Sequence, residues 1–145
     1  MFATIAHRVR QWTKPATLGQ RGERAAARYL RKQKYVIVAR SARDKAGELD
    51  IVAVDGRAEG GRTVVFVEVK TRSGDSAGQP IEAVDDDKQQ RLTRLALRYL
   101  KRHDLLEYRW RFDIVGVTWP PGQRWPSIEH VENAFEPADV GQMFS

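Results

Sequence analysis

Two strand-like runs separated by a short polar loop constrain the fold more than any other feature of the sequence. The first run, GELDIVAVD, covers residues 47–55, and the second, TVVFVEVKTR, covers residues 63–72. Both contain many β-branched residues, which favour strands, and the loop between them is rich in glycine. Consecutive strands joined by a short loop usually pair, so we expect a hairpin inside a larger sheet.

Helical patterns lie on both sides of this hairpin. Apolar residues recur at spacings of three, four and seven, which is typical of a helix with one buried face. Asp85, Asp86 and Asp87 precede the second pattern and are suited to cap its N-terminus. The apolar positions are Leu18, Gly22, Ala25, Ala26, Tyr29 and Leu30 in the first helix, and Leu92, Leu95, Ala96, Tyr99 and Leu100 in the second.

Further strands are predicted before and after these elements. YVIVAR at 35–40 favours a strand, and SARDKAG at 41–47 has the polar composition of a turn. SGDSAGQP at 73–80 indicates a long loop, while YRWRFDIVGVTW at 108–119 and WPSIEHVE at 125–132 supply the last strands. The order α-β-β-β-α-β-β predicts an α/β fold in which helices flank a small mixed sheet.

The length of 145 residues fits one compact domain. We expect a basic N-terminal arm over residues 1–16, a folded domain over 17–133 and a C-terminal tail over 134–145. The absence of cysteine excludes disulfides and thiolate metal sites. No run of about 18 apolar residues is present and the first residues do not form a signal-peptide core, so we expect a cytoplasmic protein without a membrane segment.

Charge is divided unevenly along the chain. Residues 1–46 contain 12 basic and 2 acidic side chains, whereas residues 47–145 contain 13 and 17. A basic segment beside carboxylates suits a protein that attracts a polyanion and performs metal chemistry on it. A basic tail that aids solubility or binds nucleic acid weakly is the alternative, and charge alone does not separate the two.

The predicted hairpin brings Asp50 close to Glu68, and Lys70 shares a strand face with Glu68. Mg²⁺ is usually held by one or two carboxylates together with waters and substrate phosphate. Asp50 and Glu68 are therefore candidate ligands for Mg²⁺ or Mn²⁺, and Lys70 is a candidate to orient or deprotonate the attacking water. A plain salt bridge between Glu68 and Lys70 is the structural alternative.

Other polar residues are weaker candidates. Glu23 borders the apolar face of the first helix and could reach the same site, or it could be a solvated acid near a helix start. Glu48 shares the face of Asp50 but is ranked below it as a turn residue. Asp113 is expected to pair with Arg109 or Arg111. His7, His103 and His130 lack the spacing of metal ligands.

The second helix also carries a basic stripe beside its apolar face. Arg91, Arg94 and Arg98 form this stripe, and Lys88 lies near the helix start. We expect these residues to contact nucleic acid if the stripe overlooks the acidic residues, and to form a solvated face otherwise. Phosphate-binding loops of the GxxxxGK[ST] and GxGxxG types are absent, as are the GxSxG and HExxH motifs.

Together these motifs resemble the YraN family of small bacterial proteins, which are described as candidate endonucleases. The resemblance rests on Gly22-Glu23, GELDIVAVD and VFVEVKTR and covers roughly residues 18–118. It implies a restriction-endonuclease-like core with the PD-(D/E)xK pattern, similar to archaeal Holliday-junction resolvases. The residue before Asp50 is Leu49, so the proline of the motif name is missing.

The resemblance also implies roles for individual residues. Glu23 corresponds to the helix acid, Asp50 and Glu68 to metal ligands, and Lys70 to the catalytic lysine. Thr71 and Arg72 resemble the polar and basic pair that follows this lysine in resolvases, and we expect them to contact phosphate.

The sequence thus supports two hypotheses about function. In the first, the protein is a Mg²⁺-dependent endonuclease acting on DNA, with branched or structured DNA as the favoured substrate and a homodimer as the active form. In the second, a non-catalytic adaptor keeps a nuclease fold and binds nucleic acid or another protein. Occupation of all four polar positions by residues capable of the chemistry favours the enzyme.

Overall fold

The computed structural model describes residues 15–57, 61–74 and 84–138. Its elements follow the predicted order α-β-β-β-α-β-β. The α/β class is confirmed, and the arrangement is consistent with the restriction-endonuclease-like core that the resemblance implies. The elements are α2 (Leu18–Lys32), β1 (Val36–Asp44), β2 (Gly47–Asp55), β3 (Thr63–Ser73), α3 (Asp86–Arg102), β4 (Arg109–Trp119) and β5 (Ser127–Phe135).

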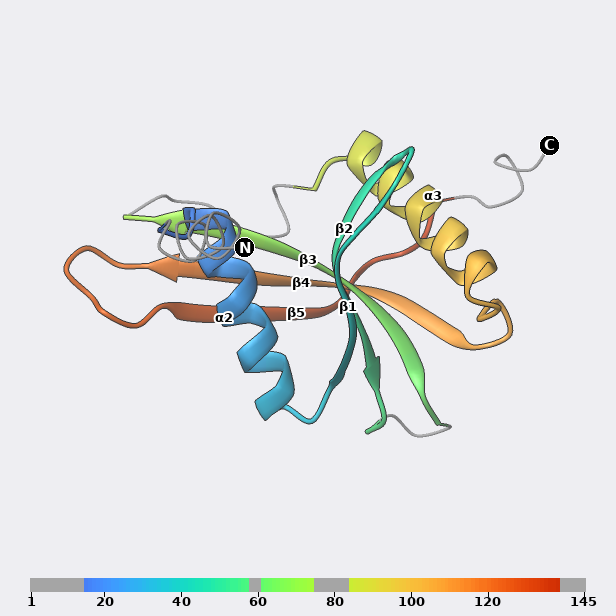
Figure 1. Ribbon diagram of the computed structural model, residues 1–145, viewed down its shortest axis with the longest axis horizontal. Helices are drawn as coiled ribbons and strands as arrows, with labels where there is room; N and C mark the ends of the chain where they lie inside the picture. The colour runs from blue at the N-terminus through green and yellow to red at the C-terminus, as the bar shows by residue number, and fades with distance from the viewer. Residues whose placement is uncertain (1–14, 58–60, 75–83, 139–145) are drawn as a thin grey trace, which may run out of the picture.

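The five strands form one mixed sheet in the order β1-β2-β3-β4-β5. β3 and β4 run parallel, and α3 provides the crossover that a parallel pair needs. The other neighbouring strands are antiparallel. Figure 1 shows a strongly twisted sheet with α2 and α3 on opposite sides of it.

Each helix covers its own half of the core. Leu92, Leu95 and Leu100 of α3 pack with Phe66 and Phe112 on one face of the sheet. On the other face, Ala26, Ala27 and Leu30 of α2 pack in a separate cluster with the apolar strand residues Ile51, Val65, Val67, Val115 and Val117. The apolar periodicity in the sequence therefore predicted most of the buried face of both helices, although Leu18 is exposed and the buried Ala27 was not predicted.

Local capping fixes where both helices begin. Thr17 and Gln20 form a reciprocal capping box at the start of α2, in which each side chain bonds the backbone of the other residue. At the start of α3, the Asp85 carboxylate accepts a hydrogen bond from the Lys88 amide at 2.9 Å. The predicted aspartate cap is therefore confirmed, with Asp85 as the capping residue.

The turn predicted over SARDKAG at 41–47 is wrong over most of its length. β1 continues to Asp44, and its residues remain paired with β2 down to Asp44 opposite Gly47. β1 is an edge strand, so its polar side chains face solvent while the backbone keeps its ladder. The pairing register shifts between Ile37 and Ala39, and Ser41 has a φ of 50°.

A buried network of charged and polar groups lies at the end of the sheet where the β2–β3 hairpin turns. Arg111 bonds both Asp55 and Asp113, and His130 Nε2 donates to Asp113 at 2.8 Å. The Tyr29 hydroxyl donates to His130 Nδ1 at 3.0 Å. The prediction that Asp113 pairs with Arg111 is confirmed, and no buried side-chain nitrogen or oxygen among the described residues lacks a partner.

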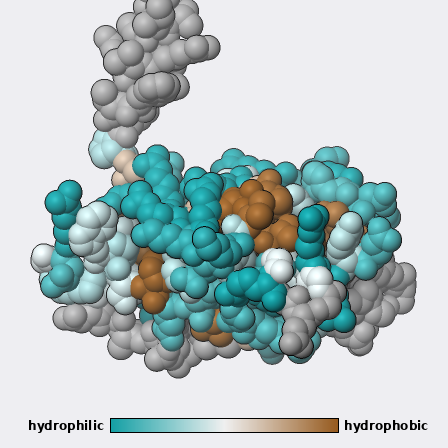
Figure 2. Space-filling model, turned by 90° about the horizontal axis from the view of Figure 1, so that it is seen from below, coloured by the Kyte–Doolittle hydropathy of each residue, from teal (hydrophilic) through white to brown (hydrophobic). Residues whose placement is uncertain are grey.

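Figure 2 shows one face of the molecule, on which hydrophilic side chains dominate and apolar patches are small and separated.

Neither of the two described helices has the length and apolar character needed to cross a membrane. β5 runs on to Phe135, beyond the expected domain boundary at 133. Most of the predicted arm, the 73–80 loop and the C-terminal tail lie outside the described residues.

Candidate active site

The site begins where β2 and β3 separate. Their ladder pairs Ile51 with Val67, and no further pairing of described residues follows in this direction. In the fork, Asp50 Oδ2 accepts a hydrogen bond from the Val69 amide at 2.9 Å, in place of a partner from the β2 backbone. The fork therefore holds the Asp50 carboxylate beside the strand that carries Glu68.

Glu68 lies between two lysines. Its Oε1 atom is 3.4 Å from Lys70 Nζ and 2.8 Å from Lys88 Nζ. Lys70 is on the same strand, two residues away, whereas Lys88 comes from the first turns of α3. The predicted salt bridge within FVEVK is thus present, but it belongs to a cluster of three ionised groups in which Glu68 is 12% exposed.

The environment shifts the proton affinity of these groups in opposite directions. Burial raises the pKa of Asp50 to about 7, and the neighbouring Glu68 carboxylate adds to this rise. Burial, together with Lys88, lowers the pKa of Lys70. Hydrogen bonding to Glu68 raises the pKa of Lys88, although burial opposes it. The site therefore combines an acid whose pKa is raised with a lysine whose pKa is lowered.

Glu23 reaches the same site from α2. Its carboxylate accepts hydrogen bonds from Ser41 Oγ at 3.1 and 3.3 Å and lies 3.5 Å from Arg40 Nε. The negative charge of Glu23 also contributes to the raised pKa of Asp50. The prediction that Glu23 borders the site, rather than pointing into bulk solvent, agrees with this placement.

A cavity of about 460 Å³ opens beside Asp50 and Glu23, and Glu68, Lys70 and Lys88 are not among the described residues that line it. Glu23, Glu48 and Asp50 line it together with Thr71, so three acidic residues face one space. Glu48 is engaged by Arg43, whose Nε atom lies 2.8 Å from its carboxylate. The cavity lining is Leu18, Gly19, Gln20, Glu23, Ser41, Arg43, Glu48, Asp50, Val69 and Thr71.

The basic stripe of α3 lies apart from this cavity. Arg91 and Arg94 are exposed on the helix surface, and Arg98 Nε is paired with Asp44 at 2.7 Å. Arg72 is half-buried near the end of β3, where it lies opposite Thr118 of β4. Contact of these residues with nucleic acid stays a prediction, whereas Lys88 differs from the rest of the stripe because it bonds Glu68.

Two contacts of the site could not be read from the sequence. Lys88 was expected only to bind nucleic acid. Its contact with Glu68 was not predicted, because Glu68 is twenty positions earlier in the chain. Ser41 fell in a predicted turn, yet it donates to Glu23. The sequence gives a partial signal for the position of Lys88. Asp85 lies three residues before Lys88 and caps the helix, which places Lys88 in the first turn of α3.

The donor set of the site fits a hard divalent cation. Asp50 and Glu68 supply oxygen atoms from neighbouring strands, and burial together with repulsion from Glu68 keeps the pKa of Asp50 high. A divalent cation between them would relieve this repulsion, and one or two carboxylates are the usual protein share of a Mg²⁺ site. In the described ranges, no group of three or more His, Asp or Glu side chains has the geometry of a complete metal site.

The family model and the individual relatives that match this chain all belong to one protein family. Residues 22–117, which contain Glu23, Asp50, Glu68 and Lys70, match the model of the uncharacterised protein family UPF0102. A UPF0102 protein from Rhodopirellula baltica is 44% identical over 153 residues, covering 99% of this chain and 90% of that protein.

Other relatives carry the same family designation. A UPF0102 protein from Pelobacter propionicus is 48% identical over 118 residues, covering 81% of each chain. One from Nocardia farcinica is 47% identical over 118 residues, covering 81% of this chain and 88% of the relative. The resemblance found in the motifs is thereby confirmed, and the chain belongs to the UPF0102 family, also called the YraN family.

Proposed function

We propose that this protein is a metal-dependent nuclease that hydrolyses phosphodiester bonds of DNA. The observation that carries the proposal is the convergence of Asp50, Glu68 and Lys70 at the fork between β2 and β3. A surface salt bridge alone would not need a second, buried carboxylate whose pKa is raised to about 7. Perturbed groups beside a cavity are typical of catalytic sites.

Asp50 and Glu68 would hold the cation, with Mg²⁺ or Mn²⁺ as the expected ion. When bound, such an ion lowers the pKa of a water molecule and neutralises negative charge on the phosphate. Glu23 lines the same cavity and would orient water through its carboxylate, while Ser41 and Arg40 fix its position.

The two lysines have different tasks in this scheme. Lys70 has a lowered pKa, so its amine can accept a proton from the attacking water at lower pH than an ordinary lysine could. Lys88 stays protonated and supplies positive charge beside Glu68, where the developing charge on the phosphate would be stabilised. Thr71 lines the cavity next to them and is placed to contact a phosphate oxygen.

Branched or structured DNA is the substrate we favour, because the motif arrangement is most similar to that of Holliday-junction resolvases. Cutting both strands of a junction needs two sites, so a homodimer is the form we propose for that reaction.

Cleavage of labelled DNA tests the proposal. Four-way junction, single-stranded and duplex DNA are incubated with Mg²⁺ or Mn²⁺ and with the unaltered protein, Asp50→Asn or Lys70→Met. Each substitution is expected to lower the cleavage rate by at least about 100-fold, as loss of one transition-state contact often does. Glu107→Gln removes an exposed carboxylate after α3 and serves as the control.

The outcome distinguishes the two hypotheses about function. Cleavage by the unaltered protein and by Glu107→Gln, but not by Asp50→Asn, supports the nuclease. Equal DNA binding without cleavage by any of these proteins would contradict it and favour a non-catalytic adaptor.

A further inference from the structure

A second cavity lies on the side of α2 that faces the β4–β5 hairpin. It has a volume of about 420 Å³, and its lining combines basic with aromatic side chains. No Asp or Glu occurs among the described residues that line it. We call this cavity the α2 groove, and it is lined by Arg21, Arg24, Ala25, Arg28, Tyr29, Lys32, Trp119, Arg124, Trp125, Pro126 and Ile128.

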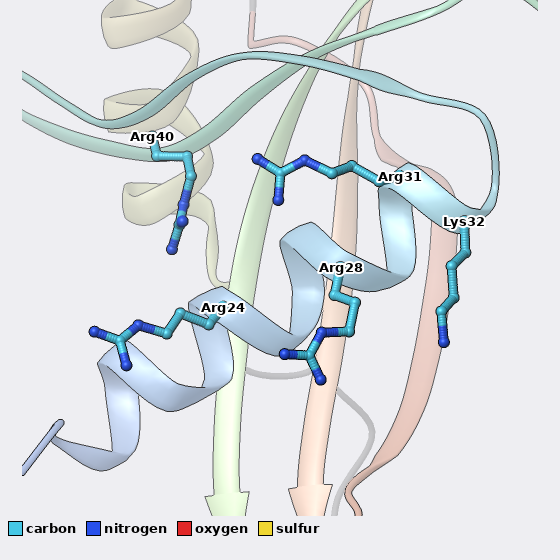
Figure 3. Close-up of a pocket in the computed structure, with 5 residues that line it drawn as sticks. All are labelled: Arg24, Arg28, Arg31, Lys32 and Arg40. Atoms are coloured by element: carbon cyan, nitrogen blue, oxygen red, sulfur yellow. The ribbon is translucent and has the colours of Figure 1, made fainter.

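Cations continue from the groove across the outer surface of α2. The described residues that line a neighbouring cavity of about 430 Å³ are all basic: Arg24, Arg28, Arg31, Lys32 and Arg40. Figure 3 shows four of these side chains on α2 and Arg40 reaching toward the helix from β1. Arg24, Arg28 and Lys32 line both cavities and recur every four residues, so they form a basic ridge along one side of the helix.

This ridge is not neutralised within the described chain. Of the five cations that line the neighbouring cavity, Arg40 alone forms an ion pair with another described residue, Glu23. Like charges this close repel one another, and a polyanion is the ligand that would relieve the repulsion. Phosphates spaced along a nucleic acid strand fit cations spaced along a helix.

The tryptophans give the groove a second, independent property. Trp125 is 66% exposed, which is unusual for a large aromatic side chain. The Arg124 guanidinium lies 5.4 Å from its ring centre, and Arg21 lies 4.6 Å from the ring centre of Trp119. Exposed aromatic rings beside cations are the means by which proteins stack unpaired bases while holding their phosphates.

The groove and the candidate active site lie on opposite sides of the N-terminal half of α2. Glu23 lines the active-site cavity, and Arg21 and Arg24, on either side of it in the sequence, line the groove. Gly22 lies directly against Thr71, so α2 and β3 are in contact between the two cavities. A strand that crosses the N-terminal half of α2 would reach both the carboxylates and the tryptophans.

We propose that the α2 groove binds an unpaired segment of a DNA strand, with phosphates on the basic ridge and a base stacked on Trp125. This inference rests on the proposed nuclease function and specifies its substrate as DNA with a single-stranded stretch beside the cleaved bond. It assigns the unpaired strand to α2, on the opposite side of the sheet from the arginine stripe of α3.

Binding without cleavage tests the stacking site. Fluorescence anisotropy of labelled oligodeoxythymidine is measured with chelator present, for the unaltered protein, Trp125→Ala, Trp125→Phe and Tyr108→Ala. Loss of one stacked base should weaken binding by about 5- to 100-fold in Trp125→Ala, whereas Trp125→Phe keeps most of the affinity. The aromatic control is Tyr108, which is 44% exposed. It immediately precedes β4, at the opposite end of this strand from Trp119.

A duplex oligonucleotide separates stacking from general loss of affinity. Trp125→Ala should leave duplex binding within about twofold of the unaltered protein, because paired bases cannot stack on the ring. An unchanged affinity for oligodeoxythymidine in Trp125→Ala would overturn the proposal. So would an equal loss for oligodeoxythymidine and duplex.

The basic ridge is tested with a matched pair of arginines. Arg28→Ala should weaken single-strand binding and lower the salt dependence of binding by roughly one phosphate contact. Arg109→Ala removes an exposed arginine at the other end of β4 from Trp119 and should do neither. Equal effects of the two substitutions would overturn the assignment of phosphates to α2.

The same proteins distinguish failure of the groove from failure of the nuclease. If Trp125→Ala loses single-strand binding and no protein cleaves DNA, the groove stands and the proposed function fails. If the unaltered protein and Trp125→Ala bind oligodeoxythymidine equally while both cleave DNA, the nuclease stands and the groove fails.

Discussion

Gly22 is the residue through which α2 meets the strand that carries Glu68 and Lys70. A Cβ atom at this position would overlap Thr71 Oγ1 and lie 2.7 Å from Thr71 Cβ. Gly22 is buried, and Thr71 lines the active-site cavity. The absence of a side chain is therefore what allows the helix to approach the site closely.

Replacing Gly22 by Ala should destabilise the protein. The clash with Thr71 forces the helix or the strand to move, which costs about 1–3 kcal/mol of unfolding free energy. Gly19→Ala is the matched control, since nothing lies within 4 Å of its Cβ position, and it should gain up to about 1 kcal/mol from helix propensity. Urea denaturation measures both, and equal stability of the two variants would contradict the close approach.

Asp55 gives a prediction about pH. Burial opposes its charge, but hydrogen bonds from Arg57 and Arg111 lower its pKa from 3.8 to about 2. The stabilisation that the Asp55 carboxylate adds to the free energy of unfolding is therefore complete above its ordinary pKa. It is lost as pH falls through about 2. Asp55→Asn should cost about 2 kcal/mol near neutral pH and less as the solution is acidified.

Urea denaturation from about pH 6 down to about pH 3 measures this difference. Asp86→Asn, which alters an exposed aspartate, is the control for general effects of charge. A stability difference between Asp55→Asn and the unaltered protein that stays constant over this range would contradict the lowered pKa.

At the scale of elements, α3 depends on its cap. Asp85→Ala removes the acceptor for the Lys88 amide and should cost about 1 kcal/mol of unfolding free energy. Gln90→Ala changes an exposed position inside the same helix and should have an effect near zero. Thermal or urea denaturation compares them, and an Asp85→Ala variant as stable as Gln90→Ala would show that the cap contributes nothing.

The helices and strands also show which sequence signals were sufficient to predict secondary structure. Apolar periodicity predicted both helices, and runs rich in β-branched residues predicted the strands. The polar run at 41–47 was misleading, because β1 is an edge strand whose outward side chains resemble those of a turn. Backbone pairing with β2, which leaves no local signal in residues 41–44, decided the outcome.

At the scale of the whole molecule, the sequence predicted the part of the site that depends on local connection. Asp50 and Glu68 lie on consecutive strands with a short loop between them, so their approach followed from the hairpin. The contact of Lys88 with Glu68 depends on where α3 crosses the sheet, and that placement is set by packing. The link from Asp113 through His130 to Tyr29 likewise joins three distant elements.

The basic and acidic parts of the sequence lie on neighbouring elements of the fold. The described part of the basic first third of the sequence includes α2, whose surface carries the basic ridge of Arg24, Arg28 and Lys32. The acids of β2 and β3 lie on the neighbouring strands that the helix covers. In the function that we propose, attraction of a polyanion and chemistry on it would take place in adjacent parts of one molecule.

The measurement that tests the central claim most directly is cleavage of a labelled four-way DNA junction with Mg²⁺ by the unaltered protein and by Glu68→Gln. Loss of the Glu68 charge should reduce the cleavage rate by at least about 100-fold, while junction binding in chelator stays unchanged. Glu107→Gln should cleave like the unaltered protein. Equal cleavage by Glu68→Gln and the unaltered protein would contradict the assignment of catalysis to the fork between β2 and β3.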